Sequence, residues 1–471
     1  MKQYQSSDIR NFSIVGHGDS GKTCLSEAML KLGGEINRLG TIEDGSTTSD
    51  YHPGEKARQI SIHATPLHME WMEKKFNLID TPGYSDFIGE ATGALSVVDL
   101  ALITIHAVNG VEVGTETMWN QATKLGIPKI LVVNGLDREH TRFDEILAQA
   151  RRRFGNNVFP MMFPVNAGLN YNQNVDVLRT ELITYQTDGS GKMTEGELPD
   201  ELIEKAKALH QELIEYVAES DDSLLEKFFE EGSLSEEEMR SGIHEAIQNQ
   251  TFVPLFCTSA TSNIGVARVC DFISKYGSSP DDRKSVTAHD EQGNEVQILL
   301  DGNDSVLQIF KTMAEAHSGE LSLFRVYSGM VKTGNDFYNT DRNTHERIGQ
   351  MFILNGKNKT QVDALYAGDI ASVVKLKNTH MGNTLCSGKH VKLPSMNLPN
   401  PNIHAAIVPT AKGDEEKLAI GLATLHEEDT TFIYRVDSEV KQTIISGQGE
   451  LHLTVTTERL KRRFGIDIEL E

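Results

Sequence analysis

Short apolar runs alternate with longer stretches of helical character over the first 280 residues of the chain. The clearest runs lie at residues 12–15, 76–79, 101–105, 129–133 and 254–257. Their length and spacing predict strands joined by helices, the pattern of a doubly wound parallel sheet. Most runs are followed by polar residues or by glycine, at the edge where an open α/β sheet holds its ligand. We therefore expect an α/β ligand-binding domain over residues 1–280.

One segment interrupts this alternation between about residues 171 and 250. Carboxylates clearly outnumber basic side chains there, and stretches such as 200–204 and 235–239 are typical of helices. The pattern predicts an acidic helical insertion. Its charge fits a solvated helical face, and it also fits a surface that meets a basic partner, so both interpretations stay open.

A different pattern begins after residues 280–283, which have the composition of a linker. Apolar runs at 306–310, 323–327 and 370–374 alternate with turn residues. Short strands separated by turns are typical of a β-barrel, which we place at about residues 290–395.

The last part of the chain follows a second linker, residues 394–401, which contains three prolines. Two predicted helices, at 414–428 and 450–464, lie among short predicted strands in the order β-α-β-β-α-β. This is the ferredoxin-like order. The sequence therefore predicts an α+β domain over residues 402–471.

Composition narrows the class of protein. The chain has 471 residues, 38% of them hydrophobic, and no apolar run approaches the ~20 residues that span a bilayer. The first eight residues lack the apolar core of a signal peptide, so we expect a cytoplasmic protein without a membrane partner. A net charge of −23 argues against nonspecific coating of nucleic acid, although local basic patches can still dock on a ribosome.

The four cysteines do not form a recognisable ligand or disulfide pattern. They are widely scattered, at Cys24, Cys257, Cys270 and Cys386. Metal sites use closely spaced pairs, and disulfide frameworks are typical of short secreted chains. We expect buried, reduced thiols.

The first chemical motif directly follows the first predicted strand. Residues 16–23 read Gly-His-Gly-Asp-Ser-Gly-Lys-Thr, which fits G-x-x-x-x-G-K-[ST]. Such a loop directs backbone N–H groups at phosphate oxygens, and the following helix adds a favourable field. Lys22 is then expected to reach the β- and γ-phosphates, with the Thr23 hydroxyl on Mg²⁺. The motif predicts a nucleotide site.

Three further motifs follow later strands in a fixed order. Residues 80–83, Asp-Thr-Pro-Gly, place a carboxylate for the Mg²⁺ shell and a glycine N–H near a γ-phosphate. In residues 134–137, Asn-Gly-Leu-Asp, the Asp137 carboxylate can accept two hydrogen bonds that guanine offers and adenine does not. Ser259-Ala260 supplies a backbone N–H for the guanine O6. The set indicates a guanine-nucleotide site, and it argues against an unrelated ATPase.

With these motifs in place, the chain resembles elongation factor G, a translational GTPase family, from about Ile9 to its last residue. The resemblance includes residues 44–62 (DGSTTSDYHPGEKARQISI), which match the family's first switch, and residues 324–329 (FRVYSG) in the predicted barrel. It also includes residues 446–453 (SGQGELHL) in the last domain. The resemblance implies a P-loop GTPase domain followed by the barrel and the ferredoxin-like domain.

The resemblance also assigns roles to individual residues. It implies GTP or GDP and Mg²⁺ as cofactors, and the ribosome, with its RNA and proteins, as the partner of a monomeric factor. The nucleotide would be bound by His17, Gly18, Asp19, Ser20, Gly21, Lys22, Thr23, Cys24, Asp80, Asn134, Asp137, Ser259, Ala260 and Thr261. Thr23, Ser61 and Asp80 would hold the metal ion, and Tyr84, Lys22 and Gly83 would take part in hydrolysis.

The chain departs from the family pattern at three positions. The first switch of the family ends Arg-Gly-Ile-Thr, whereas this chain has Arg-Gln-Ile-Ser at 58–61, so Ser61 should be a weaker metal ligand. Gly135 stands where the family has a lysine that packs on the base, and its loss should lower nucleotide affinity. Tyr84 stands where the family has the histidine that positions the attacking water.

These departures leave two functions to be separated. A phenol with a pKa near 10 is no useful base at neutral pH, yet it can hydrogen-bond a water, so we expect slow hydrolysis coupled to translocation in a full-length factor. The alternative is a nucleotide-gated ribosome-binding factor with little or no hydrolysis. The family continues into two further domains, so the chain is interpreted either as a shortened piece or as a three-domain factor. The substitutions resemble those of divergent second copies of the family.

Overall fold

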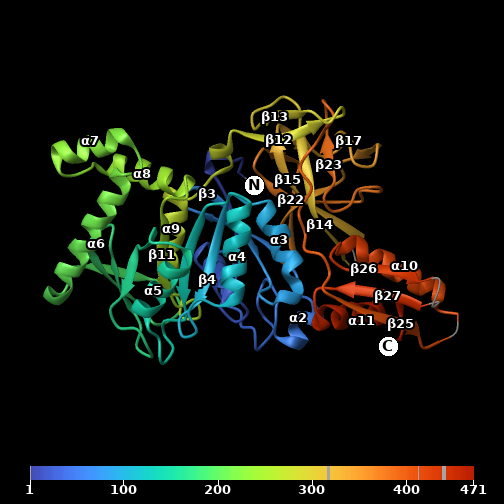
Figure 1. Ribbon diagram of the computed structural model, residues 1–471, viewed down its shortest axis with the longest axis horizontal. Helices are drawn as coiled ribbons and strands as arrows, with labels where there is room; N and C mark the ends of the chain where they lie inside the picture. Colours follow the sequence, from blue (N-terminus) through green and yellow to red (C-terminus); the bar gives the residue numbers. More distant parts are fainter. Residues whose placement is uncertain (1, 316–318, 412, 438–441, 471) are drawn as a thin grey trace.

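The computed structural model describes residues 2–315, 319–411, 413–437 and 442–470. Its centre is a seven-stranded sheet in the order β2-β3-β1-β4-β5-β11-β6 (Figure 1). All neighbours pair in parallel except β2 and β3, which are antiparallel. The strands are β1 (Ile9–Gly16), β2 (Thr65–Trp71), β3 (Lys74–Asp80), β4 (Leu100–His106), β5 (Lys129–Asn134), β6 (Val158–Pro160) and β11 (Val253–Thr258). The predicted parallel α/β sheet is confirmed.

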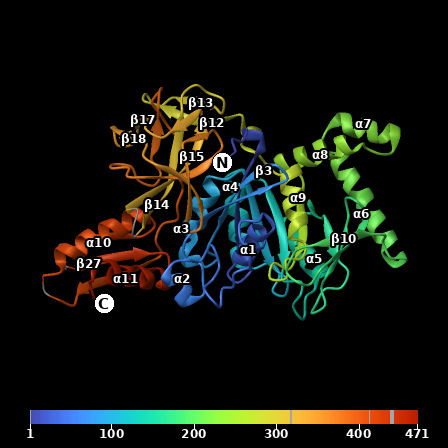
Figure 2. The same ribbon diagram turned by 180° about the vertical axis from the view of Figure 1, so that it is seen from behind.

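Helices cover both faces of this sheet because its strands are apolar on both sides (Figures 1 and 2). On one face, α1 (Lys22–Leu32) packs beside α9 (Val266–Tyr276). On the other lie α3 (Ile88–Ser96) and α4 (Val113–Lys124), the latter stacked through Trp119 on Phe154 of α5 (Phe143–Phe154). The short η1 (Ser6–Asp8), α2 (Pro53–Arg58) and η2 (Ser85–Phe87) complete this first part of the chain.

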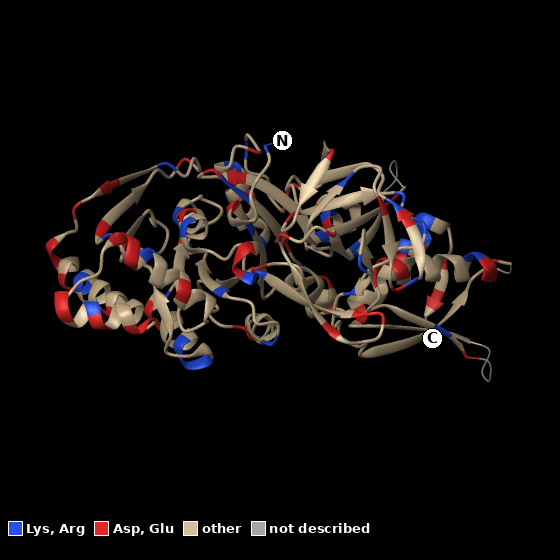
Figure 3. Cartoon of the chain, turned by 90° about the horizontal axis from the view of Figure 1, so that it is seen from above, with Lys and Arg blue, Asp and Glu red and all other residues tan. Residues whose placement is uncertain are grey.

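The acidic insertion is only partly helical. Its carboxylate-rich helices, α6 (Asp200–Ala218), α7 (Asp222–Glu231) and α8 (Glu236–Gln248), extend from one end of the molecule (Figure 3). The preceding β8 (Gln173–Asp176), β9 (Glu181–Tyr185) and β10 (Met193–Gly196) instead form an antiparallel sheet with β7 (Met162–Pro164). The helical prediction was therefore wrong for these three short strands. They pair in the order β10-β9-β8, and β8 pairs with β7, which lies before the insertion.

The second part of the chain is built from strands, as predicted. Its first small sheet contains β12 (Ser285–Asp290), β13 (Glu295–Leu299) and β24 (Val391–Lys392). An eight-stranded sheet joins β14 (Val306–Glu315), β15 (Gly319–Ser328), β17 (Asp336–Asn339), β18 (Thr344–Arg347), β19 (Met351–Asn355), β20 (Asn358–Val362), β22 (Ile370–Val374) and β23 (Thr384–Cys386). A pair, β16 (Met330–Lys332) and β21 (Ala364–Tyr366), completes it. The predicted linker at 280–283 forms the short η3 (Pro280–Arg283).

The third part has the predicted β-α-β-β-α-β order. Its elements are β25 (Ile403–Pro409), α10 (Glu415–Glu428), β26 (Ile433–Asp437), β27 (Gln442–Gly447), α11 (Glu450–Phe464) and β28 (Ile468–Leu470). The sheet order β26-β27-β25-β28 is the ferredoxin-like arrangement. Its hydrophobic core, which includes Leu422, Phe432 and Ile445, is formed within this part alone.

Candidate nucleotide-binding site

A cavity of about 470 Å³ opens at the carboxyl edge of the central sheet. Parallel strands β1 and β3 both end at this edge, so the motifs that follow them meet there. The lining residues come from the phosphate loop, residues 39–43, the first switch and the turns after β3, β5 and β11. They include Gly18, Asp19, Gly21, Lys22, Thr23, Cys24, Glu27, Asp50, Ser61, Gly83, Tyr84, Arg138, Ala260 and Thr261.

The phosphate loop is shaped for anion binding. Asp19 and Gly21 adopt positive φ values of 59° and 83°, and α1 begins directly afterwards at Lys22. The amino terminus of α1 therefore faces the cavity, where its free N–H groups favour negative charge. The Lys22 ammonium donates to the His17 carbonyl at 2.6 Å, and burial lowers its pKa to about 8. A bound phosphate would favour the charged form of this lysine.

Gly83 lies in close contact with this loop. A Cβ atom at this position would fall 2.3 Å from the Lys22 ammonium and 2.7 Å from the Gly18 backbone nitrogen. Real side chains do not tolerate such contacts, so only glycine permits this approach. The turn after β3 is thereby held against the phosphate loop.

Hydroxyls and carboxylates meet beneath the loop. The Thr23 hydroxyl donates to Oδ2 of Asp80 at 2.8 Å and lies 3.1 Å from the Ser61 hydroxyl. Oδ1 of Asp80 and both carboxylate oxygens of Asp50 are buried without a hydrogen-bond partner. Burial and the neighbouring charge of Asp80 raise the pKa of Asp50 to about 7. These unsatisfied oxygens fit Mg²⁺, which prefers oxygen ligands and retains several waters.

Asp50 was not singled out by sequence reasoning. It lies inside the switch segment 44–62, but nothing in its local sequence distinguishes it from Asp44. Only the fold buries it beside Asp80. Among the described residues, no three His, Cys, Asp or Glu side chains form a group that could hold a metal ion.

The turns after β5 and β11 are joined at the other end of the cavity. Oδ1 of Asn134 accepts from the Ala260 N–H at 2.9 Å, and its amide donates to the Ser20 carbonyl at 3.1 Å. Oδ2 of Asp137 accepts from the hydroxyls of Thr261 and Ser262 at 3.3 and 3.0 Å. Asn134 thus ties the phosphate loop to the turn after β11. Asp137 is oriented by two hydroxyls, of which the one on Ser262 was not indicated by the sequence.

Not every predicted side chain faces this cavity. The Ser20 hydroxyl is buried against the His17 carbonyl and Thr104, at 2.7 Å from each. The imidazole of His17 instead accepts from the Gly114 N–H at 3.2 Å and borders a second cavity of about 240 Å³. His17 and Ser20 can therefore contribute backbone groups, but their side chains shape the loop. Ser259 likewise lies behind Ala260, with its N–H bonded to the Ile264 carbonyl.

Tyr84 stands between the two cavities and lines both. Its ring lies against Gly18, where an added Cβ would be 3.4 Å from the ring, and the side chain is 37% exposed. Partial burial and the charge of Asp19 raise the pKa of the phenol above its ordinary value of 10.0. The phenol is therefore neutral around pH 7 and can act there only through hydrogen bonds.

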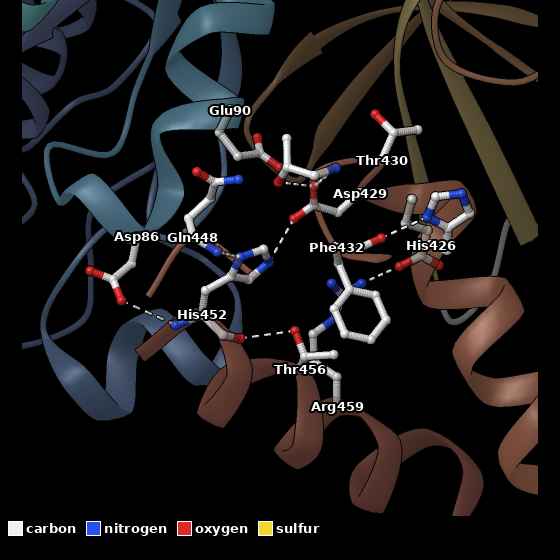
Figure 4. A network of polar contacts seen from close by, with 12 residues as sticks. Asp86, Glu90, His426, Asp429, Thr430, Phe432, Gln448, His452, Thr456 and Arg459 are labelled. Carbon is white, nitrogen blue, oxygen red and sulfur yellow. Dashed lines mark hydrogen bonds and ion pairs between the residues drawn. The ribbon is translucent and has the colours of Figure 1, made fainter. Parts of the chain in front are cut away.

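The residues just after Tyr84 contact the third part of the chain (Figure 4). Oδ1 of Asp86 accepts from the backbone N–H groups of Leu451 and His452 at 3.0 and 3.3 Å, which caps the start of α11. The His452 ring accepts from the Gln448 N–H at 3.1 Å and pairs with Asp429 at 3.0 Å. The turn that borders the nucleotide cavity is thus bonded directly to another part of the fold.

Comparisons with known proteins agree along the whole length of the chain. The family model described as Elongation factor Tu GTP binding domain matches residues 7–279. Two further models, Elongation factor G domain 2 and Elongation Factor G, domain III, match residues 306–388 and 398–471. The chain belongs to the elongation factor G family.

A relative and a solved structure support this membership. Elongation factor G of Salinibacter ruber is 38% identical over 464 residues, which cover 97% of this chain and 66% of the relative. A crystal structure of a Thermus thermophilus protein matches with a TM-score of 0.89 at 30% identity, covering 99% of this chain and 67% of the other. The chain therefore spans about two thirds of the length of the proteins it matches. Among the described residues, no helix has both the length and the apolar character needed to cross a membrane.

Proposed function

We propose that this chain binds GTP and GDP with Mg²⁺ in the cavity at the sheet edge, and that it hydrolyses GTP when it meets the ribosome. One observation carries the proposal: the phosphate loop, Thr23 with Ser61, and Thr261 line one cavity. Asp80 and Asp137 lie directly behind this lining, because they accept hydrogen bonds from the Thr23 and Thr261 hydroxyls. The family membership supports the same function. The proposal includes a cytoplasmic location, a monomeric state and the ribosome as the partner.

The proposed roles follow from the chemistry of each group. Lys22 and the backbone N–H groups of the loop bind the phosphates, while Thr23, Ser61 and Asp80 hold the metal ion with Asp50 nearby. Mg²⁺, when bound, supplies charge that stabilises the transferred phosphoryl group. The serine in place of the family's threonine retains the required hydroxyl.

Guanine selection is proposed to rest on Asp137. Its carboxylate can accept from both N1–H and the exocyclic amine of guanine, whereas adenine offers no matching pair of donors. We expect GTP and GDP to bind at least about a thousandfold more tightly than ATP. Asp137→Asn should remove this preference, whereas Asp144→Asn, on an exposed side chain, should not. Competition of each nucleotide against labelled GDP measures both.

Hydrolysis is tested by phosphate release from GTP with and without ribosomes. We expect ribosomes to accelerate release, and Tyr84→His to accelerate it further, because a histidine can position water and share its proton near neutral pH. Equal rates for Tyr84→His and the parent protein would mean that Tyr84 does not limit turnover.

The second candidate function is ribosome binding controlled by nucleotide with little hydrolysis. The neutral phenol of Tyr84 favours it, because the raised pKa prevents this side chain from acting as a base at physiological pH. GTP-dependent binding to ribosomes, without phosphate release above the background, would select this candidate. A chain without GTP affinity would contradict both.

A further inference from the structure

The base end of the cavity contains a cation, the guanidinium of Arg138. Arg138 follows directly on Asp137 and lines the cavity together with Ala260 and Thr261. These are the turns that hold Asp137 through its hydroxyl contacts. Arg138 therefore lies at the end where a guanine base is expected, rather than at the phosphate loop.

The backbone folds Arg138 back over Gly135. The Arg138 N–H donates to the Gly135 carbonyl at 3.1 Å, which closes a tight turn. A Cβ atom added to Gly135 would lie 3.5 Å from Nε of Arg138 and 3.6 Å from its Cδ. The arginine stem therefore lies beside the position from which a longer side chain at residue 135 would start.

The guanidinium of Arg138 contacts the His106 ring and makes no ion pair with a described carboxylate. Among the residues that the structure describes, no carboxylate lies within ion-pairing distance of Arg138. Its Nη1 lies 2.9 Å from Nε2 of His106, whose Nδ1 accepts from the Val108 and Asn109 N–H groups at 3.2 Å each. Burial and the Arg138 charge lower the pKa of His106, so its ring is neutral and the contact is a hydrogen bond, not an ion pair. A hydrogen bond to a neutral ring holds the guanidinium less firmly than an ion pair would.

We propose that Arg138 packs its guanidinium on the face of the bound guanine, and so replaces the base contact that is lost with glycine at position 135. A guanidinium is planar and weakly hydrated, and it stacks on aromatic rings and nucleobases. Arg138 is thus a binding residue that acts on the base, separately from the hydrogen bonds of Asp137. The inference rests on the proposed nucleotide-binding function.

The test measures the affinity of the whole chain for GDP in the presence of Mg²⁺, with Arg138→Ala, Arg138→Lys and a matched control. The control is Arg142→Ala, because Arg142 is 69% exposed, pairs with Glu145 and does not line the cavity. We expect Arg138→Ala to weaken GDP binding about tenfold, in line with a desolvated cation–π contact. Arg138→Lys should lose most of the same factor, because an ammonium keeps the charge but not the plane. The control should stay within twofold of the parent protein.

A second-site variant separates packing on the base from a nonspecific loss of GDP affinity. Gly135→Lys in the Arg138→Ala background should recover at least threefold in GDP affinity. Gly135→Lys alone should bind GDP no more tightly than the parent protein, because the Arg138 side chain already lies beside this position. Unchanged melting temperatures of the two Arg138 variants without nucleotide would show that the fold is intact.

Each result either supports or overturns the proposed role of Arg138. Binding by Arg138→Ala within twofold of the parent protein would overturn the inference, and full affinity in Arg138→Lys would replace base packing with a purely electrostatic role. If Gly135→Lys does not fold, the two single variants at Arg138 still decide. A parent protein that binds no GDP would instead overturn the proposed function itself.

Discussion

The second and third parts of the chain are attached to the nucleotide-binding part in different ways. The second part shares a buried hydrophobic cluster with it, in which Val97 and Val98 pack among residues such as Phe310, Leu323 and Ile370. The third part keeps its own core, and among the described residues it shares a small hydrophobic cluster around Phe87 with the nucleotide-binding part. Apolar area buried between two parts resists their separation, so the second part is the more firmly fixed.

The polar contacts show the same difference. Arg325, in the FRVYSG segment, is buried with Asp99 at 2.8 Å, and Lys75 is buried with Asp369 at 2.5 Å. Neither of these pairs involves residues of the first switch or the turn that contains Tyr84. The third part is instead bonded through Asp86, just beyond Tyr84, and through Arg58 of the first switch, which pairs with Glu458.

The comparison identifies which attachment can respond to nucleotide. On the proposed function, a γ-phosphate would act on the first switch and on the turn at Gly83, because these segments line the cavity. They are also the segments that hold α11. Nucleotide exchange should therefore move the third part relative to the first, while the second part stays in place.

The largest expected effect is on the fixed interface. Arg325→Ala leaves the Asp99 carboxylate buried with only Asn11 at 3.0 Å and Arg283 at 3.7 Å as partners. Breaking a buried ion pair from one side costs about 3 kcal/mol of unfolding free energy. Chemical denaturation would measure this loss, which should be the same with GDP and with a non-hydrolysable GTP analogue. The exposed Arg347→Ala is the control. A loss in Arg325→Ala that differs between the two nucleotides would contradict a fixed position of the second part.

A smaller loss is expected at Glu90, which joins several segments. Its carboxylate accepts from the Ala64 N–H at 2.6 Å, beyond the first switch, and pairs with Lys311 of the second part. Glu90→Gln should cost about 2 kcal/mol, because Lys311 stays buried without a countercharge. The exposed Glu145→Gln should cost almost nothing.

This loss should depend on pH in a defined direction. Burial alone would raise the pKa of Glu90, but the Lys311 charge outweighs it and holds the pKa well below its usual range. A carboxyl with a depressed folded-state pKa stabilises the protein above its unfolded value of about 4.3, and this contribution disappears as the pH falls toward the folded value. The difference between the parent protein and Glu90→Gln should therefore shrink below about pH 4. A constant difference would mean that the ion pair contributes nothing.

The smallest expected effect on stability is at Asp86. Asp86→Ala removes the cap of α11 and should cost about 1 kcal/mol. Asp86→Asn keeps an oxygen that can accept the same N–H bonds, so it should behave much like the parent protein. The loss in Asp86→Ala should be greater with the GTP analogue than with GDP, measured as the melting temperature in each state. Equal losses in both states would mean that the contact between Asp86 and α11 does not depend on the bound nucleotide.

Much of this architecture was predictable because its signals are local. The apolar runs predicted β1, β3, β4, β5 and β11, and the glycine and lysine spacing predicted the phosphate loop. The strands at 173–196 and the antiparallel β2 were missed, since their pairing depends on partners elsewhere in the fold. Short strands of this kind carry little signal of their own.

The residues of the candidate site fall into the same two groups, those with a local sequence signal and those without one. Lys22, Thr23, Asp80 and Asp137 could be named from motifs, although their assignment to a bound nucleotide remains a prediction. The sequence did not reveal the burial of Asp50 beside Asp80, or the capping of α11 by Asp86. These arrangements join residues far apart in the chain, so they follow from the tertiary fold and not from any local pattern.

The most direct test of the account compares two distances in two nucleotide states. Labels at exposed Lys124 on α4 and Glu416 on α10 report on the third part, and labels at Lys124 and exposed Asp336 on β17 report on the second. Spin labels would be attached to cysteines introduced at these positions, with the half-buried Cys24 replaced. Pulsed electron–electron double resonance would then give both distances with GDP and with a non-hydrolysable GTP analogue. The account predicts that the distance from Lys124 to Glu416 changes while the distance from Lys124 to Asp336 stays constant. An unchanged distance to Glu416, or an equal change in both, would contradict it.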